Sequence, residues 1–266
     1  MHFETGQSKN SDAFYERYPN FEPVFDKLMV LGNNCFGREV KAKNWMERIC
    51  FDLGHTCRDD FLEVFFMAIH GHGSAALKLL RGLYERAVTL AYIAKYPDKA
   101  EKFRNYSAVQ ENKALNAALR LVTEEQFNEA NKGSGSADEI RRWYNQVKPE
   151  FEVTRCRKCG DRGIAFSWDV DLASMVQNVG NPFDEYYLAA YTIPNFHVHA
   201  TFATTFDGAP EEARIKRREN ESEFALGASM GLLLQVMHTE NEVFHLGVES
   251  DIASINEYLK NVWNPD

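Results

Sequence analysis

The sequence predicts an all-α protein, a single-domain helical bundle of about 8–10 helices with an irregular Cys-x-x-Cys loop. Apolar residues recur with a helical period along almost the whole chain, and no segment shows a convincing strand alternation. Helix-start signals precede several of these segments, including capping boxes at Thr123 with Gln126 and at Ser136 with Glu139. The composition, 44% hydrophobic and 26% charged over 266 residues, is that of an ordinary soluble protein.

The first half of the chain contains the most apolar helical stretch. We expect its helices at residues 11–31, 40–53, 61–69, 74–95 and 97–121. Pro19 and Pro23 are expected to break or bend the first of these, because proline lacks a backbone donor. Gly54 is expected to end the second, since glycine suits a helix C-terminus.

The second half contains shorter helices and more irregular segments. We expect a short helix after the capping box at Thr123, and helices at residues 140–147, 169–179, 185–204, 221–246 and 251–262. Pro194 should kink or end the helix in which it lies. Residues 206–220 are expected to form a charged loop, and a minor strand pair could form within residues 151–168.

The predicted organisation is one domain overall. Residues 1–58 are expected to form N-terminal helices that pack on a bundle core made by residues 59–266. Surface loops are expected at residues 132–136, a glycine-serine stretch, and at residues 150–168.

Net charge and cysteine usage restrict the class of protein. The net charge of −9 disfavours a protein whose whole surface binds nucleic-acid phosphates, but it is compatible with a local basic groove. Five cysteines, an odd number, are typical of reduced thiols in a cytoplasmic protein. The N-terminus has no signal-peptide pattern, and no apolar run is long enough to span a bilayer. We therefore expect a cytoplasmic protein without membrane partners.

Arg81 and Glu85 are the first candidate functional residues. They lie four positions apart in the most apolar helix, on a flank of an apolar arc that covers more than half of the helix circumference. Such a pair should lie at the edge of the core, where burying two charges is costly unless they are paired. It could be a structural salt bridge, or an arginine held rigid to bind an anionic ligand such as phosphate.

Two histidines follow Pro194 in the segment Asn195-Phe-His-Val-His199. At about 100° per residue they are roughly 200° apart on a helix, so at most one of them faces the centre of the bundle. Either could be an ordinary core histidine. Titratable imidazoles beside a helix-disrupting proline also suit a functional site, and His199 is the favoured candidate.

The loop Arg155-Cys-Arg-Lys-Cys-Gly160 looks like half of a zinc knuckle. A structural zinc site needs four ligands, and no second Cys-x-x-Cys exists, so Cys156 and Cys159 would need distant partners. The alternative is a basic loop that is solvated or contacts an anion. Two other patterns are weaker: Glu242-x-x-His245 is half of a di-iron motif, and Arg48 with His55 poorly matches the motif of helical ribonucleases.

Several local patterns, taken in order, resemble an uncharacterised family of bacterial all-helical proteins known only as a domain of unknown function. The resemblance covers about residues 60–245. It rests on the helix Leu79–Glu85, Phe103-Arg-Asn-Tyr106 with Lys113, Trp168 with residues 172–179, Tyr187, Tyr191 and the segment Asn195-x-x-x-His199. The family pattern has a serine where this chain has Asn195, so the serine hydroxyl is missing here.

Such proteins resemble the higher-eukaryote-and-prokaryote nucleotide-binding (HEPN) helical bundles, many of which are ribonuclease toxins or phage-defence effectors. The resemblance implies that Arg81 and Glu85 meet His199 across the bundle, beside Tyr187 or Tyr191. It also implies RNA or a nucleotide as the partner and leaves a homodimer open.

Three hypotheses follow. In the first, the protein is a helical effector that cleaves RNA or a nucleotide without a metal. Arg81 would bind phosphate, Glu85 would orient it, and His199 would act as general acid or base. The substrate-binding residues would be Tyr187, Tyr191, Asn195 and His197. In the second, Arg81, Glu85 and His199 form a buried polar network in a non-catalytic interaction module. In the third, zinc on Cys156 and Cys159 stabilises the domain; the first two need no cofactor.

Overall fold

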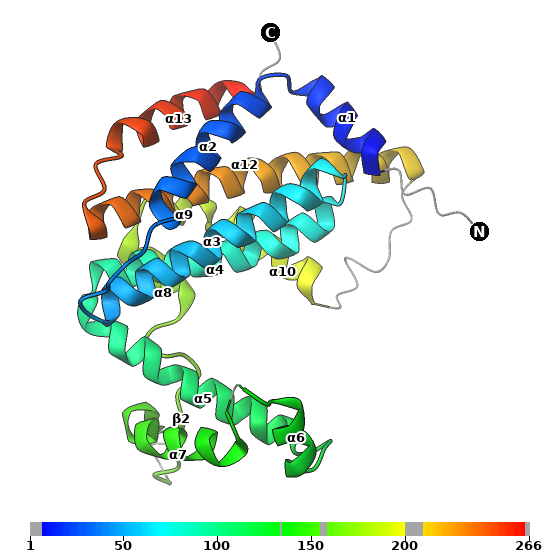
Figure 1. Cartoon of the computed structure of the whole chain (residues 1–266). Coiled ribbons are helices and arrows are strands. Elements are labelled where there is room, and N and C mark those ends of the chain that lie inside the picture. Colours follow the sequence, from blue (N-terminus) through cyan, green and yellow to red (C-terminus); the bar gives the residue numbers. More distant parts are fainter. Residues whose placement is uncertain (1–6, 134, 155–158, 200–209, 264–266) are drawn as a thin grey trace. The chain divides into compact units, whose positions relative to one another are not determined.

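The computed structural model describes residues 7–133, 135–154, 159–199 and 210–263. Apart from one two-stranded antiparallel sheet, the regular structure of these residues is helical, which confirms the all-α class (Figure 1). The chain divides into two compact units, one made of residues 1–95 with 172–266 and the other of residues 96–171. The predicted division at residue 58 stays a prediction. Within the described residues, no helix is long and apolar enough to cross a membrane.

The first unit contains the longest helices of the protein. Its elements are α1 (Gln7–Arg17), α2 (Phe21–Phe36), α3 (Trp45–Ile69), α4 (Gly73–Lys95), α8 (Leu172–Val179), α9 (Phe183–Tyr186), the π-helix η3 (Tyr187–Thr192), α10 (Ile193–Val198), α12 (Glu211–Phe244) and α13 (Glu249–Val262). The most extensive contacts join α3, α4 and α12, and these three helices form the core. Helices α2 and α13 pack against each other and on α12, whereas α8, η3 and α10 pack on α4.

Helix α4 is the most buried of the core helices, as its broad apolar arc predicts. Leu80, Leu83, Tyr84, Ala87 and Leu90 have no exposed surface at all. Full burial of a side chain of this size contributes about 1.5–3 kcal/mol relative to an exposed one. The apolar face of α4 therefore fixes the position of the polar flank that carries Arg81 and Glu85.

The expectation that Gly54 ends a helix is wrong. Helix α3 runs without interruption through Gly54, where the structure removes any room for a side chain. A Cβ atom built there would lie 2.6 Å from Cε1 of Phe36 and 2.9 Å from Oε1 of Glu240. Glycine is thus needed at this position for close packing and not for a helix end, although it costs helix stability in water.

Two other expectations about helix ends are also corrected. Residues 211–220 form the exposed first turns of α12 and not a loop, because the Glu, Arg, Lys and Ala of this stretch are good helix formers. Pro194 does not end its helix, since α9, η3 and α10 are continuous, and the alternative, a kink at Pro194, stays a prediction. The wider turns of η3 come just before Pro194, which lies in the first turn of α10, where the helix returns to α geometry. Residues 200–204 lie outside the described residues.

Pro19 breaks the predicted first helix, as expected, whereas Pro23 does not interrupt α2. Helix α1 ends at Arg17, and Pro19 lies in the short connection before α2 begins. Pro23 lies in the first turn of α2, where its missing N–H removes no helical hydrogen bond.

The second unit is smaller. Its elements are η1 (Pro97–Lys99), α5 (Ala100–Ala118), α6 (Glu124–Ala130), α7 (Ala137–Val147), η2 (Lys148–Phe151), β1 (Glu152–Thr154) and β2 (Arg162–Ile164). Helix α5 packs on α7 through a cluster of Leu115, Ala137 and Ile140. Both predicted capping boxes form, at the starts of α6 and α7, and the strand pair places Val153 opposite Gly163.

Candidate functional site

The pair Arg81 and Glu85 lies at the edge of the core, as the sequence predicts. An Nη2 donor of Arg81 bonds Oε1 of Glu85 at 2.6 Å, and the two side chains are 24% and 38% exposed. The guanidinium carbon lies 5.1 Å from the centre of the Tyr191 ring, in a cation–π contact. One carboxylate and one aromatic face therefore hold the guanidinium on α4, while part of it stays accessible.

Three tyrosines form the neighbouring surface where η3 packs on α4. The ring of Tyr191 lies 5.4 Å from that of Tyr187, and both lie 6.3–6.4 Å from the fully buried ring of Tyr84. The hydroxyl of Tyr84 donates to the carbonyl of Phe183 at 2.7 Å, which anchors the start of α9. Burial, the main cause, raises the pKa of Tyr84, so this hydroxyl remains a donor at neutral pH.

His197 is the imidazole that contacts α4. Its Nδ1 lies 3.0 Å from Oγ of Ser74 in the first turn of α4. The order of contacts, Tyr191 with Arg81 and His197 with Ser74, shows that the η3–α10 segment runs antiparallel to α4. Asn195 lies between Tyr191 and His197 in the sequence.

His199 and Asn195 are placed differently from His197. His199 is exposed at the end of α10, where its backbone N–H donates to the carbonyl of Asn195 at 3.2 Å. Within the described residues, no contact joins its side chain to Arg81 or Glu85. Asn195 has a buried Oδ1 without a hydrogen-bond partner, and the buried Nε of Arg81 likewise has none. Two buried polar atoms without partners are unusual in a packed protein and are typical of a site that binds something polar.

The structure therefore brings together Arg81, Glu85, Tyr187 and Tyr191 from the predicted set, and it places His197 nearby through Ser74. Sequence reasoning missed Ser74 and Tyr84, to which it assigned no role in the site. No sequence signal could have identified Ser74, because its contact depends on which of the two histidines faces α4.

The metal hypothesis concerns residues at the edge of the described chain. Cys156 lies outside the described residues, and Cys159 is an exposed free thiol. In the described part of the chain, no group of three or more His, Cys, Asp or Glu residues could hold a metal ion. The residues of the weak di-iron pattern do not act as one group in the structure. Glu242 pairs with His238 at 3.7 Å on the surface, whereas His245 lies just after the end of α12, in the left-handed conformation.

Glu240 is a second polar centre that sequence reasoning missed. It lies between His238 and Glu242 in the sequence but points inward, with no exposed side-chain surface. Its Oε2 accepts a long bond of 3.4 Å from Nη2 of Arg38, and its Oε1 has no partner. The only signal in the sequence is its spacing, since it follows the apolar residues Val236 and Met237 on the buried side of α12.

The surroundings of Glu240 are unusually apolar for a carboxyl group. Burial raises its pKa to about 8, although Arg38 opposes the shift. The buried thiols of Cys35, Cys50 and Cys57 also have pKa values raised mainly by burial, with the carboxylate of Glu240 as a further cause. These thiols therefore stay protonated and unreactive at neutral pH.

The part of the chain that matches a known protein family includes the site around Arg81. The sequence pattern of a family of unknown function, DUF5677, matches residues 56–208, which is more than half of the chain. This chain belongs to the DUF5677 family. The matched range contains Arg81, Glu85, Ser74 and the whole η3–α10 segment, whereas Glu240 lies beyond it. No curated protein and no solved structure matches the chain.

Proposed function

We propose that this DUF5677 protein is a helical effector directed at RNA or a nucleotide, and that it cleaves a phosphodiester bond without a metal. One observation carries the proposal: the guanidinium of Arg81 is held by Glu85 and by the ring of Tyr191, yet remains partly accessible. A guanidinium fixed in this way is suited to bind a phosphate and to stabilise the charge that develops on it. The buried Nε of Arg81, which lacks a partner, supports the same assignment.

The other residues of the candidate site are assigned the remaining roles. Tyr187 and Tyr191 offer aromatic surface on which a base stacks, and Asn195, whose buried Oδ1 has no partner among the described residues, is assigned to contact the ligand. His199 is assigned as the general acid or base, and His197, which contacts Ser74, is its alternative for this role. In an RNA, the base removes the proton of the 2′-hydroxyl, the resulting oxygen attacks phosphorus, and the leaving 5′-oxygen takes up a proton.

The test compares variants of the full chain for cleavage of a labelled single-stranded RNA. We expect Arg81→Ala to lower the rate by about a hundredfold or more, because it removes the phosphate ligand, with a melting temperature close to that of the wild type. Arg81→Lys should recover only part of the rate, since lysine lacks the bidentate geometry. His199→Ala and His197→Ala then show which imidazole acts, as only one of them should abolish cleavage.

Arg141→Ala is the matched control. Arg141 forms a surface ion pair with Glu124 at 2.7 Å, and its side chain is 37% exposed, so its loss removes a similar pair far from the site in the sequence. This variant should cleave at the wild-type rate. A wild-type protein that neither binds nor cleaves RNA or nucleotides contradicts the proposal.

The non-catalytic interaction module is the second candidate function. The exposed position of His199 favours it, because an imidazole in water adds little to a site on α4. In that case Arg81 and Glu85 fix the packing of η3 on α4, and both Arg81→Ala and Tyr191→Ala lower the melting temperature while no cleavage is seen in the wild type.

A further inference from the structure

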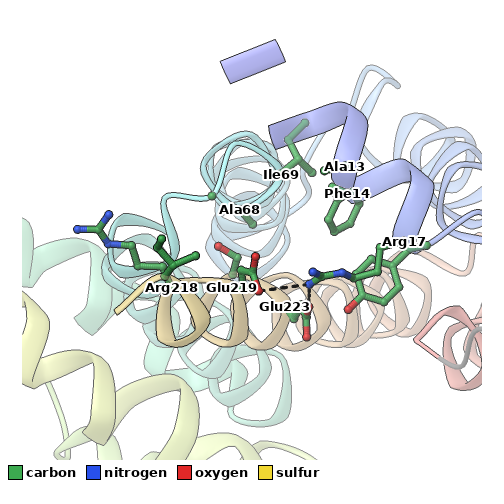
Figure 2. Close-up of a pocket in the computed structure, with 12 residues that line it drawn as sticks. Ala13, Phe14, Arg17, Ala68, Ile69, Arg218, Glu219 and Glu223 are labelled. Atoms are coloured by element: carbon green, nitrogen blue, oxygen red, sulfur yellow. Dashed lines mark hydrogen bonds and ion pairs between the residues drawn. The ribbon is translucent and has the colours of Figure 1, made fainter. Parts of the chain in front are cut away.

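A hollow of about 320 Å³ lies in the first unit between α1, the end of α3 and the first half of α12 (Figure 2). Its volume is at the lower end of the range of small-molecule sites. One side is apolar and is formed by Phe14 of α1 with Ala68 and Ile69 of α3. The other side is a face of α12 that carries polar residues at helical spacing, among them Glu219, Ser222 and Glu223.

Ser222 supplies the first indication of a ligand. The residue is only 6% exposed, it lines the hollow, and its hydroxyl oxygen has no hydrogen-bond partner among the residues that the structure describes. A buried hydroxyl without a partner destabilises the folded state by about 1–3 kcal/mol. A polar group that entered the hollow and bonded to this oxygen would remove that cost.

The charges on the walls indicate the sign of the ligand. Arg17 contacts both Glu219, at 3.6 Å, and Glu223, at 3.1 Å, so two carboxylates share one guanidinium. The other arginine of the lining, Arg218, extends away from this group (Figure 2). Within the group of Arg17, Glu219 and Glu223, two carboxylates face one guanidinium, and this local arrangement favours a cation.

We propose that this hollow binds a small primary amine with a short apolar tail. The ammonium group donates to Oγ of Ser222 and to the carboxylate of Glu219, and the tail packs against Phe14 and Ile69. The site shares no residue with the one that contains Arg81, so the proposal does not depend on the proposed function.

The test uses three probes with the same six-carbon tail and different head groups: hexylamine, 1-hexanol and hexanoate. Binding to the full chain is measured by isothermal titration calorimetry at pH 7. We expect hexylamine to bind about tenfold or more tightly than 1-hexanol, because its hydrogen bonds are charge-assisted, and hexanoate not to bind. The proposal is overturned if no probe binds, which leaves water as the occupant, or if hexanoate or hexanol binds as tightly as hexylamine.

Two variants locate the binding. Ser222→Ala should weaken hexylamine binding about tenfold, and Glu219→Gln should weaken it as well, because each removes one partner of the ammonium. Ser229→Ala is the matched control, since Ser229 is a buried serine two turns further along α12 whose hydroxyl donates to the carbonyl of Leu226 at 2.8 Å. Equal loss of binding in both serine variants would place the amine elsewhere. Glu219 is 45% exposed, so Glu219→Gln keeps the test valid if Ser222→Ala fails to fold.

Discussion

At Glu240, a carboxyl group is enclosed by the core with one long bond to Arg38 and one oxygen that has no partner. Its pKa is raised to about 8 in the folded protein, from the ordinary value of 4.5 for a glutamate. Folding therefore takes up a proton between these two pH values, and the free energy of unfolding falls as the pH rises from 4.5 to about 8. The stabilising contribution of the protonated group is fully present only at the acidic end of this interval.

We expect Glu240→Gln to remove this part of the pH dependence, because the amide cannot ionise. The variant should be similar to the wild type near pH 5 and more stable above pH 8, by an amount on the order of a few kcal/mol. Urea unfolding at a series of pH values measures the difference. Asp60, whose pKa burial raises to about 6, leaves a smaller slope in both proteins. Parallel pH profiles for the two proteins would show that Glu240 is ionised when folded.

Helix α3 shows how one element depends on another. Gly54→Ala should destabilise the protein by about 1–3 kcal/mol, because the added Cβ would press on Phe36 and on Glu240. Gly227→Ala is the control: this mid-helix glycine of α12 has 3.4 Å between an added Cβ and the nearest atom, on Trp263, so the change should be neutral or stabilising by up to about 1 kcal/mol. Urea unfolding compares both, and a Gly54→Ala protein as stable as the wild type would contradict the packing argument.

At the scale of single elements, the sequence predicts well those helices whose signals are local. Helix α4 and the capping boxes of α6 and α7 are predicted because their signals are local, an apolar arc in one case and paired side chains in the others. The need for glycine at position 54 is not predicted, because it arises from the side chain of Glu240 on α12, a helix far from Gly54 in the sequence. The charged start of α12 is mistaken for a loop because a helix without an apolar face has no periodic signal.

Over the whole molecule, the candidate site is predicted in part. Arg81 and Glu85 share one helix, so their contact follows from spacing alone, and the apolar arc of α4 correctly indicates partial burial. The pairing of Ser74 with His197 joins two segments far apart in the sequence, and it depends on the exact rotation of α10. A sequence pattern that assumes regular turns cannot specify that rotation.

The zinc hypothesis is tested on the whole protein. The described residues contain no group that could hold a metal ion, and the three buried thiols stay protonated. Less than about half an equivalent of zinc in the purified protein, with a melting temperature that a chelator leaves unchanged, would exclude a structural zinc site. One full equivalent that is lost in both Cys156→Ser and Cys159→Ser would establish a zinc-stabilised domain instead.

The π-helix η3 determines the direction in which the side chains of α10, the next segment of the helix, point. A π-turn accommodates one residue more than an α-turn, so a regular α-helix in its place would rotate residues 193–198 by roughly 100°. That rotation would carry the imidazole of His197 away from Ser74 and bring the half-exposed ring of Phe196 toward α4 in its place. Deleting one of residues 187–192 would remove the extra residue together with the π-turn, so His197 would keep its direction toward Ser74 in an otherwise regular helix.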